Sequence, residues 1–207
     1  MAIQAVLTGD IVHSTRLSPA QEKRLLRQLR LVLAPHQFEF YRGDSFQVYI
    51  KDAGSGLETS LLCRTAAIGL AEDAAPFIPD VRISIGIART PPPAGSLGAA
   101  RGEAFVLSGR AFDEIAKTST RLIISTANEL AAEGLKVIAD YANAIFREMT
   151  GKQANVIFEL LQGKSQQAIA TKLKKSKSTI SQHVTAGRWE EINSLLHQYK
   201  NIIKHIV

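Results

Sequence analysis

The chain has 207 residues, of which 45% are hydrophobic and 21% charged, enough to bury the core of one large domain or two modest ones. No stretch approaches the roughly 18 apolar residues of a membrane span, and the N-terminus lacks a signal-peptide layout, so we expect a cytoplasmic protein without a membrane partner. The single cysteine, Cys63, excludes a disulfide framework and a cysteine zinc site, and we expect a buried thiol.

The net charge of +6 is concentrated near the C-terminus. Residues 1–149 contain 16 basic and 16 acidic residues, whereas residues 150–207 contain 9 basic and 3 acidic residues. An electroneutral body with a basic C-terminal segment predicts a module that binds a polyanion, most simply nucleic acid, joined to a module with another role.

The chain begins with a short apolar segment over residues 3–8, followed by Gly9-Asp10. This pattern predicts a buried strand that ends in a polar turn. A helix is predicted next, because Ser18 and Gln21 form a capping-box pair ahead of a helical leucine stripe.

The following segments complete a βαββαβ order with an added α-β pair. We expect a hairpin over residues 38–50, a helix over 57–70, a strand over 81–88, a helix over 105–117 and a strand over 122–124. This order is typical of the α+β class with a ferredoxin-like (split βαβ) antiparallel sheet, with the helices on one face of the sheet.

We divide the chain into three parts. Residues 1–126 are expected to form the α+β domain, residues 127–149 a helical connector, and residues 150–207 an all-α domain. In the last part Thr150, Ser165 and Ser176 are each expected to cap a helix.

The last part carries a spacing with a physical reason at each position. Apolar residues form a small core between two crossed helices, and Ala170 is small because the helices approach there. The positions of this pattern are Ile169, Ala170, Leu173, Ser176, Thr179, Ile180, His183 and Val184.

This spacing resembles the helix-turn-helix of LuxR-type response regulators and of sigma factor region four, over about 40 residues from Thr150. The resemblance implies that the helix after Ser176 enters the DNA major groove. Departures are Gln153 and Asn155 in place of acidic residues, and Lys174 at a turn position where glycine is frequent. The DNA-binding residues so implied are Lys174, Lys175, Ser176, Lys177, Ser178, Thr179, Ser181, Gln182 and Arg188.

Two alternatives stay open for the C-terminal part. The three helices also suit a bundle used for protein contact, with lysines on a solvated face. The last helix has an apolar stripe that fits either a homodimer seam or packing onto its own domain. That stripe comprises Trp189, Ile192, Leu196, Tyr199, Ile203 and Ile206.

Two carboxylates stand out in the first domain. Asp10 follows the first strand and Asp44 lies in the hairpin turn, and these strands are neighbours in a split βαβ sheet. Such a pair is able to share Mg²⁺, the ion used in phosphoryl and nucleotidyl transfer. Each residue also suits a turn without any chemistry, because Gly-Asp is a favoured hairpin turn.

Three segments resemble the core of class III nucleotidyl cyclases and diguanylate cyclases, and the pairing with a helix-turn-helix resembles the SatD family. The segments are Gly9-Asp10-Ile11-Val12-His13-Ser14-Thr15, Arg42-Gly43-Asp44-Ser45-Phe46 and Ser84-Ile85-Gly86-Ile87-Ala88. The resemblance implies Asp10 and Asp44 as metal ligands and Arg110 as the arginine that stabilises the transition state. The resemblance also allows Mg²⁺ with a nucleotide as a cofactor, although the residues themselves do not require that cofactor.

The chain departs from the cyclase pattern where purines are recognised. Val106, Phe40 and Ala99 replace the asparagine, the lysine and its acidic companion, while Arg42 and Ser45 replace residues of the diguanylate signature. We therefore expect a DNA-binding transcriptional regulator, dimeric, whose first domain senses a ligand or mediates dimerisation. The alternatives are a divergent Mg²⁺-dependent nucleotidyl cyclase or transferase regulated by its tail, and a protein-interaction adaptor.

Overall fold

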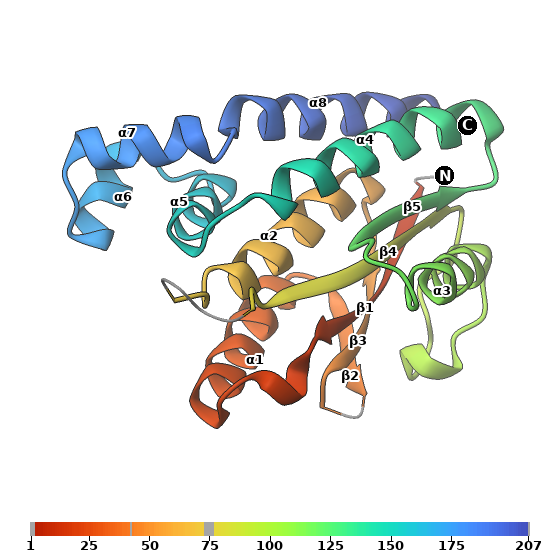
Figure 1. The fold of residues 1–207 in the computed structure, drawn as a ribbon. Helices are drawn as coiled ribbons and strands as arrows, with labels where there is room; N and C mark the ends of the chain where they lie inside the picture. The colour runs from red at the N-terminus through yellow and green to blue at the C-terminus, as the bar shows by residue number, and fades with distance from the viewer. Residues whose placement is uncertain (1–2, 42, 73–76, 207) are drawn as a thin grey trace.

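The computed structural model describes residues 3–41, 43–72 and 77–206, and it is a mixed α+β structure (Figure 1). Arg42, one of the departures from the diguanylate signature, lies outside these residues. The strands are β1 (Gln4–Val12), β2 (Gln37–Tyr41), β3 (Ser45–Ile50), β4 (Asp80–Ala88) and β5 (Leu122–Thr126). The α-helices are α1 (Pro19–Leu33), α2 (Gly56–Ile68), α3 (Glu103–Ile115), α4 (Glu129–Arg147), α5 (Gly151–Leu161), α6 (Gln166–Leu173), α7 (Lys177–Ala186) and α8 (Trp189–His205).

The described strands form one sheet in the order β2-β3-β1-β4-β5. The first four strands pair with one another in antiparallel orientation and have the ferredoxin-like arrangement that the element order predicted. Strand β5 extends the sheet beside β4 in parallel orientation. The expected fold class is therefore confirmed, with β5 as an added edge.

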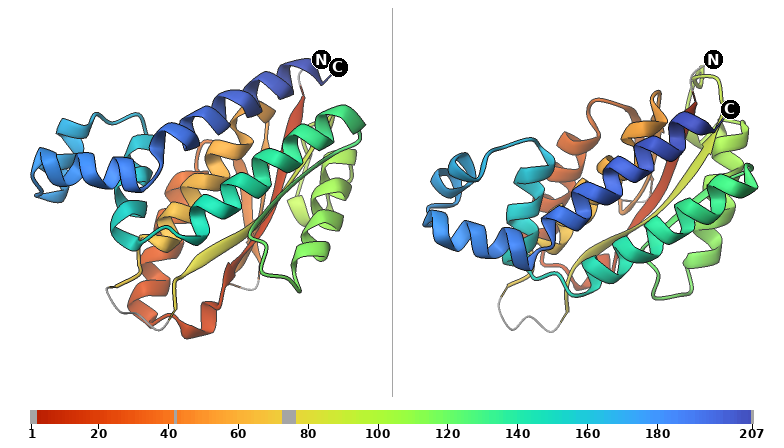
Figure 2. Two further views of the ribbon diagram at one scale, coloured as in Figure 1. Left: turned by 45° about the horizontal axis from the view of Figure 1, so that its top comes forward. Right: turned by 90° about the horizontal axis from the view of Figure 1, so that it is seen from above.

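The expectation that the helices lie on one face of the sheet is wrong. Helices α1 and α2 cover the face to which Ile83 and Ile85 contribute, whereas α3 covers the opposite face (Figure 2). The alternation of β4 permits this second layer, because Gly86 has no side chain to keep α3 away. A Cβ at Gly86 would lie 2.2 Å from the carbonyl oxygen of Ala104 in α3.

Strand β1 is longer than its sequence pattern suggested, so the expected turn at Gly9-Asp10 is wrong. Asp10 lies inside the strand and pairs with Ser45 of β3 and with Arg82 of β4. The strand continues to Val12 because β4 pairs with it to that residue and the carbonyl of Asp44 accepts a hydrogen bond from the N–H of Ile11. A glycine followed by an aspartate resembles a turn locally, and the neighbouring strands override that preference.

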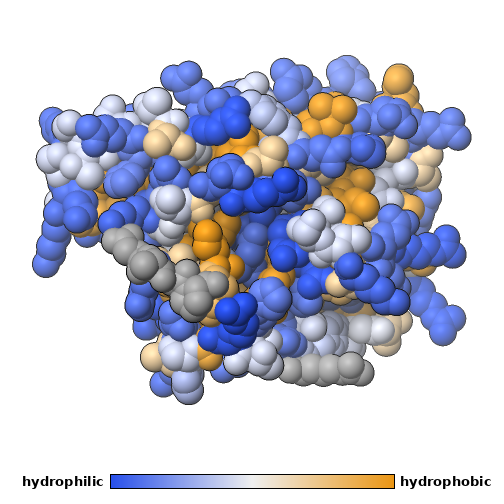
Figure 3. Space-filling model, in the orientation of Figure 1, coloured by the Kyte–Doolittle hydropathy of each residue, from blue (hydrophilic) through white to orange (hydrophobic). Residues whose placement is uncertain are grey.

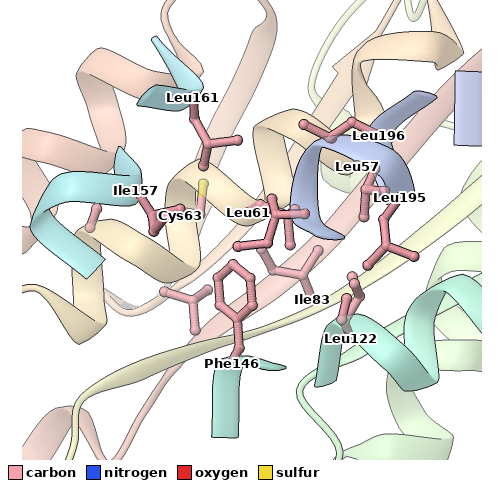
Figure 4. Close-up of a cluster of buried hydrophobic side chains, with 14 of the residues drawn as sticks. Leu57, Leu61, Cys63, Ile83, Leu122, Phe146, Ile157, Leu161, Leu195 and Leu196 are labelled. Atoms are coloured by element: carbon pink, nitrogen blue, oxygen red, sulfur yellow. The ribbon is translucent and has the colours of Figure 1, made fainter. Parts of the chain in front are cut away.

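The buried core runs without a break from the sheet to the C-terminal helices. Figure 4 shows side chains of α2, β4, β5, α4, α5 and α8 in one cluster. Cys63 is buried there, as expected, and burial raises the pKa of its thiol. The division at residues 126 and 149 stays a prediction, since the two expected domains share this core.

Helix α8 packs along α4 and reaches back to the start of the sheet (Figure 1). The hydroxyl of Tyr199 is buried and donates a hydrogen bond of 2.9 Å to the carbonyl oxygen of Ala53. The apolar stripe of α8 is buried or half-buried in its own chain, which favours the second of the two interpretations of that stripe. A homodimer therefore needs another surface, and it stays a prediction.

The surface in Figure 3 mixes hydrophilic residues with separate hydrophobic patches. On α4 the exposed apolar side chains are Leu130, Val137 and Tyr141.

None of the described helices is long and apolar enough to cross a bilayer.

Candidate functional site

The C-terminal spacing corresponds to three short helices, α5, α6 and α7. Each is capped as expected, because the side chains of Thr150, Ser165 and Ser176 accept hydrogen bonds from backbone N–H groups of their first turns. The chain turns from α6 to α7 through Lys174, which has a left-handed φ of 53°. The apolar positions buried between the helices are Ile169, Ala170, Ile180 and Val184.

The outward face of α7 is free of internal partners. Lys177, Ser178, Ser181 and Gln182 are exposed, and within the described chain their side chains make no hydrogen bond or ion pair. Their backbone belongs to a helix whose first turn is fixed by the Ser176 cap. The result is a row of polar groups on a rigid helix, all directed to solvent.

The other residues of the expected DNA-binding set differ in availability. Lys174 and Lys175 are exposed beside the turn, while Ser176 and Thr179 hydrogen-bond each other at the start of α7. Arg188 is half-buried and engaged elsewhere: it pairs with Glu191 at 3.0 Å and hydrogen-bonds the Tyr141 hydroxyl. Its guanidinium therefore ties α8 to α4.

A buried carboxylate holds α5, α6 and the loop between them together. Glu159 accepts hydrogen bonds of 2.6 Å from both Lys164 and Lys172, and only 5% of its side chain is exposed. Burial by itself would raise the pKa of Glu159, but the hydrogen bonds from the two ammonium groups outweigh burial and lower it. These two lysines are thus structural partners, distinct from the lysines near α7.

The structure brings Asp10 and Asp44 together at one end of β1 and β3, as the sequence predicted. The backbone carbonyl of Asp44 accepts a hydrogen bond from the N–H of Ile11. The Asp44 carboxylate accepts hydrogen bonds from the hydroxyls of Ser14, at 2.8 Å, and Ser45, at 3.4 Å. Burial raises the pKa of Asp10, and the charge of Asp44 raises it further.

Two arginines that sequence reasoning missed stand beside this pair. Arg82, directly opposite Asp10 in the sheet, places its Nε 3.4 Å from Asp10 Oδ1. Arg82 and Arg121 both oppose the rise in the pKa of Asp10. Arg82 and Ser84 lie on the face of β4 opposite its isoleucines, and this alternation was the available sequence signal for Arg82. The register that places Arg82 against Asp10 cannot be derived from one strand.

This arrangement does not fit a divalent cation. Mg²⁺ needs oxygen ligands about 2.1 Å away, and here a guanidinium faces the buried oxygen of Asp10. The described residues also contain no group of three or more Asp, Glu, His or Cys side chains able to hold a metal ion.

Arg110, the expected transition-state residue, lies on the exposed side of α3. The side of α3 that faces the sheet instead presents Ser108, whose hydroxyl donates to Thr8 Oγ1 at 2.8 Å and contacts the hydroxyl of Ser84. The region between the sheet and α3 is thus filled near its centre by a buried hydroxyl cluster.

A groove of about 510 Å³ lies beside this cluster, between the ends of β1 and β3 and the start of α3. Its walls include Phe46, Arg101, Phe105 and Val106. The resemblance to cyclases singled out two positions of α3, Val106 and Arg110. Val106 lines the groove, whereas Arg110 is not among its lining residues. The groove is therefore largely apolar where a purine-recognising asparagine was expected.

Comparison with solved structures gives distant likenesses only. No protein-family model matches the chain, and no curated protein matches it. Among solved structures it is similar to a bacterial light-regulated adenylyl cyclase, with 14% identity and a TM-score of 0.41, over 60% of this chain and 76% of that chain. A likeness at this level carries no argument about activity.

Proposed function

We propose that the chain is a DNA-binding regulator in which α6 and α7 form a helix-turn-helix and α7 enters the major groove. The observation that carries this proposal is the outward face of α7, where Lys177, Ser181 and Gln182 are exposed and free of internal partners. Lysine, serine and glutamine side chains suit contacts to phosphates and base edges.

The distribution of charge supports the same proposal. The basic excess lies in residues 150–207, and Lys174, Lys175 and Lys177 are exposed around the start of α7. Lysines in this position neutralise phosphates and release counterions, which provides affinity without sequence preference. The resemblance of the spacing to LuxR-type and sigma region four modules agrees with that role.

The first part of the chain acts in this proposal as the regulatory body. Helix α5 is fixed to α2, and Asn155 donates a hydrogen bond of 3.0 Å to the carbonyl oxygen of Gly69. A groove of about 470 Å³ lies at this junction, lined in part by Val32, Leu62 and Phe158. Its size is within the range of small-molecule sites, so a ligand there would act on the position of α5 and α6.

The dimer belongs to the same proposal. Two copies of α7 about 34 Å apart would read successive major grooves of a palindromic site. Light scattering of the full chain with and without its DNA site measures the oligomeric state. A monomer in both conditions would contradict the dimer while leaving single-site binding to be measured separately.

The experiment starts from selection of bound duplexes out of a random pool, since the target sequence is unknown. Fluorescence anisotropy then measures the affinity of the selected duplex for the wild type, Gln182→Ala and Lys177→Ala. Gln182→Ala should lose about 1–3 kcal/mol of discrimination between the selected and a scrambled duplex. Lys177→Ala should weaken binding to both duplexes and lower the salt slope by about 1.

Matched controls are on α8, where Gln198 and Lys204 are also exposed. Gln198→Ala and Lys204→Ala should bind as the wild type does. The proposal fails if the α7 variants bind as tightly as these controls, or if no duplex is enriched at low salt, where phosphate contacts are strongest.

Mg²⁺-dependent nucleotidyl transfer is not proposed. Asp10 is paired with Arg82, and Arg110 is exposed on the far side of α3 from the hydroxyl cluster. No feature of the described residues favours that activity over a regulatory body.

A further inference from the structure

Asp10 and Arg82 form a cross-strand pair on two inner strands, near one end of the sheet. They are direct neighbours in the antiparallel register of β1 and β4, and their side chains are 26% and 13% exposed. Asp10 Oδ1 and Arg82 Nε are both buried, and neither has a hydrogen-bond partner among the described residues. The two charged atoms therefore depend on each other, at 3.4 Å.

The guanidinium of Arg82 is held in this position from the other side. One of its terminal nitrogens donates to the carbonyl oxygens of Ile115, at 3.4 Å, and Ala116, at the end of α3. Its guanidinium also lies 6.0 Å from the ring centre of Phe112. A cation is favoured at a helix C-terminus, so this position suits the guanidinium. Arg82 would lose these contacts if it moved away from Asp10.

A divalent cation would compete directly with this guanidinium. An ion bound to Asp10 Oδ1 at about 2.1 Å would lie within about 5.5 Å of Arg82 Nε, close enough for strong repulsion in a partly buried site. Arg121 adds a second positive charge that acts on Asp10. The carboxylate of Asp44 already accepts hydrogen bonds from Ser14 and Ser45.

We infer that Arg82 is the resident cation of the Asp10–Asp44 pair: it closes this pair to divalent metal ions and ties β1 to β4 and to the end of α3. The converse follows from the same geometry. Replacement of Arg82 by an uncharged side chain removes the ion-pair partner of Asp10 beside the Asp44 carboxylate, and so creates a divalent-cation site. This inference is independent of DNA binding by α7.

The test measures Mn²⁺ binding to the full chain, without nucleotide, by electron paramagnetic resonance of free Mn²⁺. The variants are the wild type, Asp10→Asn, Arg82→Met and the double variant Arg82→Met/Asp10→Asn, each checked for folding by circular dichroism. Arg82→Met should bind Mn²⁺ at least tenfold more tightly than the wild type, and the double variant should lose that gain. Asp10→Asn should bind Mn²⁺ as weakly as the wild type.

Two results would overturn the inference. One is Mn²⁺ binding by the wild type that Asp10→Asn removes, because the pair would then be open to metal with Arg82 in place. The other is a folded Arg82→Met variant whose Mn²⁺ affinity equals that of the wild type. The first comparison uses Asp10→Asn alone, so it decides the question even if Arg82→Met does not fold.

Discussion

The face of α7 and the Asp10–Asp44 pair are both rich in polar side chains of the kind that functional sites use, yet they differ in what those side chains contact. On α7, Lys177 and Gln182 are exposed and free of internal partners. At the sheet end, Asp10 faces Arg82, and Asp44 accepts hydrogen bonds from nearby hydroxyls.

This difference separates binding groups from structural groups. A polar group that already has a buried partner must lose that partner before it contacts a ligand, which costs about as much as the new contact provides. A solvent-facing group exchanges one hydrogen-bonded state for another at little cost. Under the proposed function, the exposed groups of α7 provide recognition, whereas Asp10 and Arg82 hold the sheet together.

The largest effect on stability is expected at a second guanidinium–carboxylate pair, which is buried in the core. Arg64, 1% exposed, donates hydrogen bonds of 3.0 Å and 2.7 Å to Asp80 and one of 3.3 Å to Asn143 of α4. Arg64→Met leaves Asp80 without its partner and should cost about 3–5 kcal/mol of unfolding free energy, measured by urea denaturation.

Arg110→Met provides the matched control, because Arg110 is exposed and forms no ion pair among the described residues. Its unfolding free energy should stay within about 0.5 kcal/mol of the wild type. Equal effects of the two variants would contradict the interpretation of Arg64 as a buried structural pair.

A smaller effect is expected at Glu159 of α5, which holds α5 and α6 together. Glu159→Gln removes a charged acceptor from Lys164 and Lys172 and should cost about 1–2 kcal/mol at pH 7. Because the pKa of Glu159 is lowered in the folded chain, its contribution is present above the unfolded pKa of about 4.3 and is lost as the pH falls through the lower folded value.

Urea unfolding of both proteins from pH 7 down to pH 3 checks this prediction. The difference in unfolding free energy should be largest at neutral pH and should shrink below about pH 4. A difference that is independent of pH would mean that the charge of Glu159 plays no part.

The smallest expected effect concerns the turn before α7. Lys174 has a left-handed φ of 53°, a conformation that is unfavourable for a residue with a Cβ. Lys174→Gly should therefore raise the unfolding free energy by roughly 0.5–1 kcal/mol and the melting temperature by a few degrees.

Lys175→Gly is the matched control, since Lys175 is exposed but is not among the residues with positive φ. It should lower stability slightly, because glycine loses more conformational entropy on folding. Both variants should weaken DNA binding if both lysines contact phosphates. A stabilised Lys174→Gly variant with unchanged DNA affinity would remove Lys174 from the proposed interface.

Local sequence rules located most of the elements and caps. The capping box of Ser18 and Gln21 and the caps at Thr150, Ser165 and Ser176 depend on residues a few positions apart, and the structure confirms them. The proximity of Asp10 and Asp44 was also predictable, because the βαββαβ order makes β1 and β3 neighbours.

Contacts between distant segments decided the rest. The alternation in β4 is compatible with a free sheet face or with α3 packed against Gly86, and only the tertiary structure shows the second. The apolar stripe of α8 fitted a partner as well as its own chain, and the structure buries it in its own chain. Asp10 pairs with Arg82 because of the register between two strands about 70 residues apart, and neither strand specifies that register alone. The sequence alone shows which polar groups exist and, for the capped helices, where along the chain they lie. The three-dimensional packing decided which of them have internal partners, because partnership depends on register and on helix placement, both of which are set by the core as a whole.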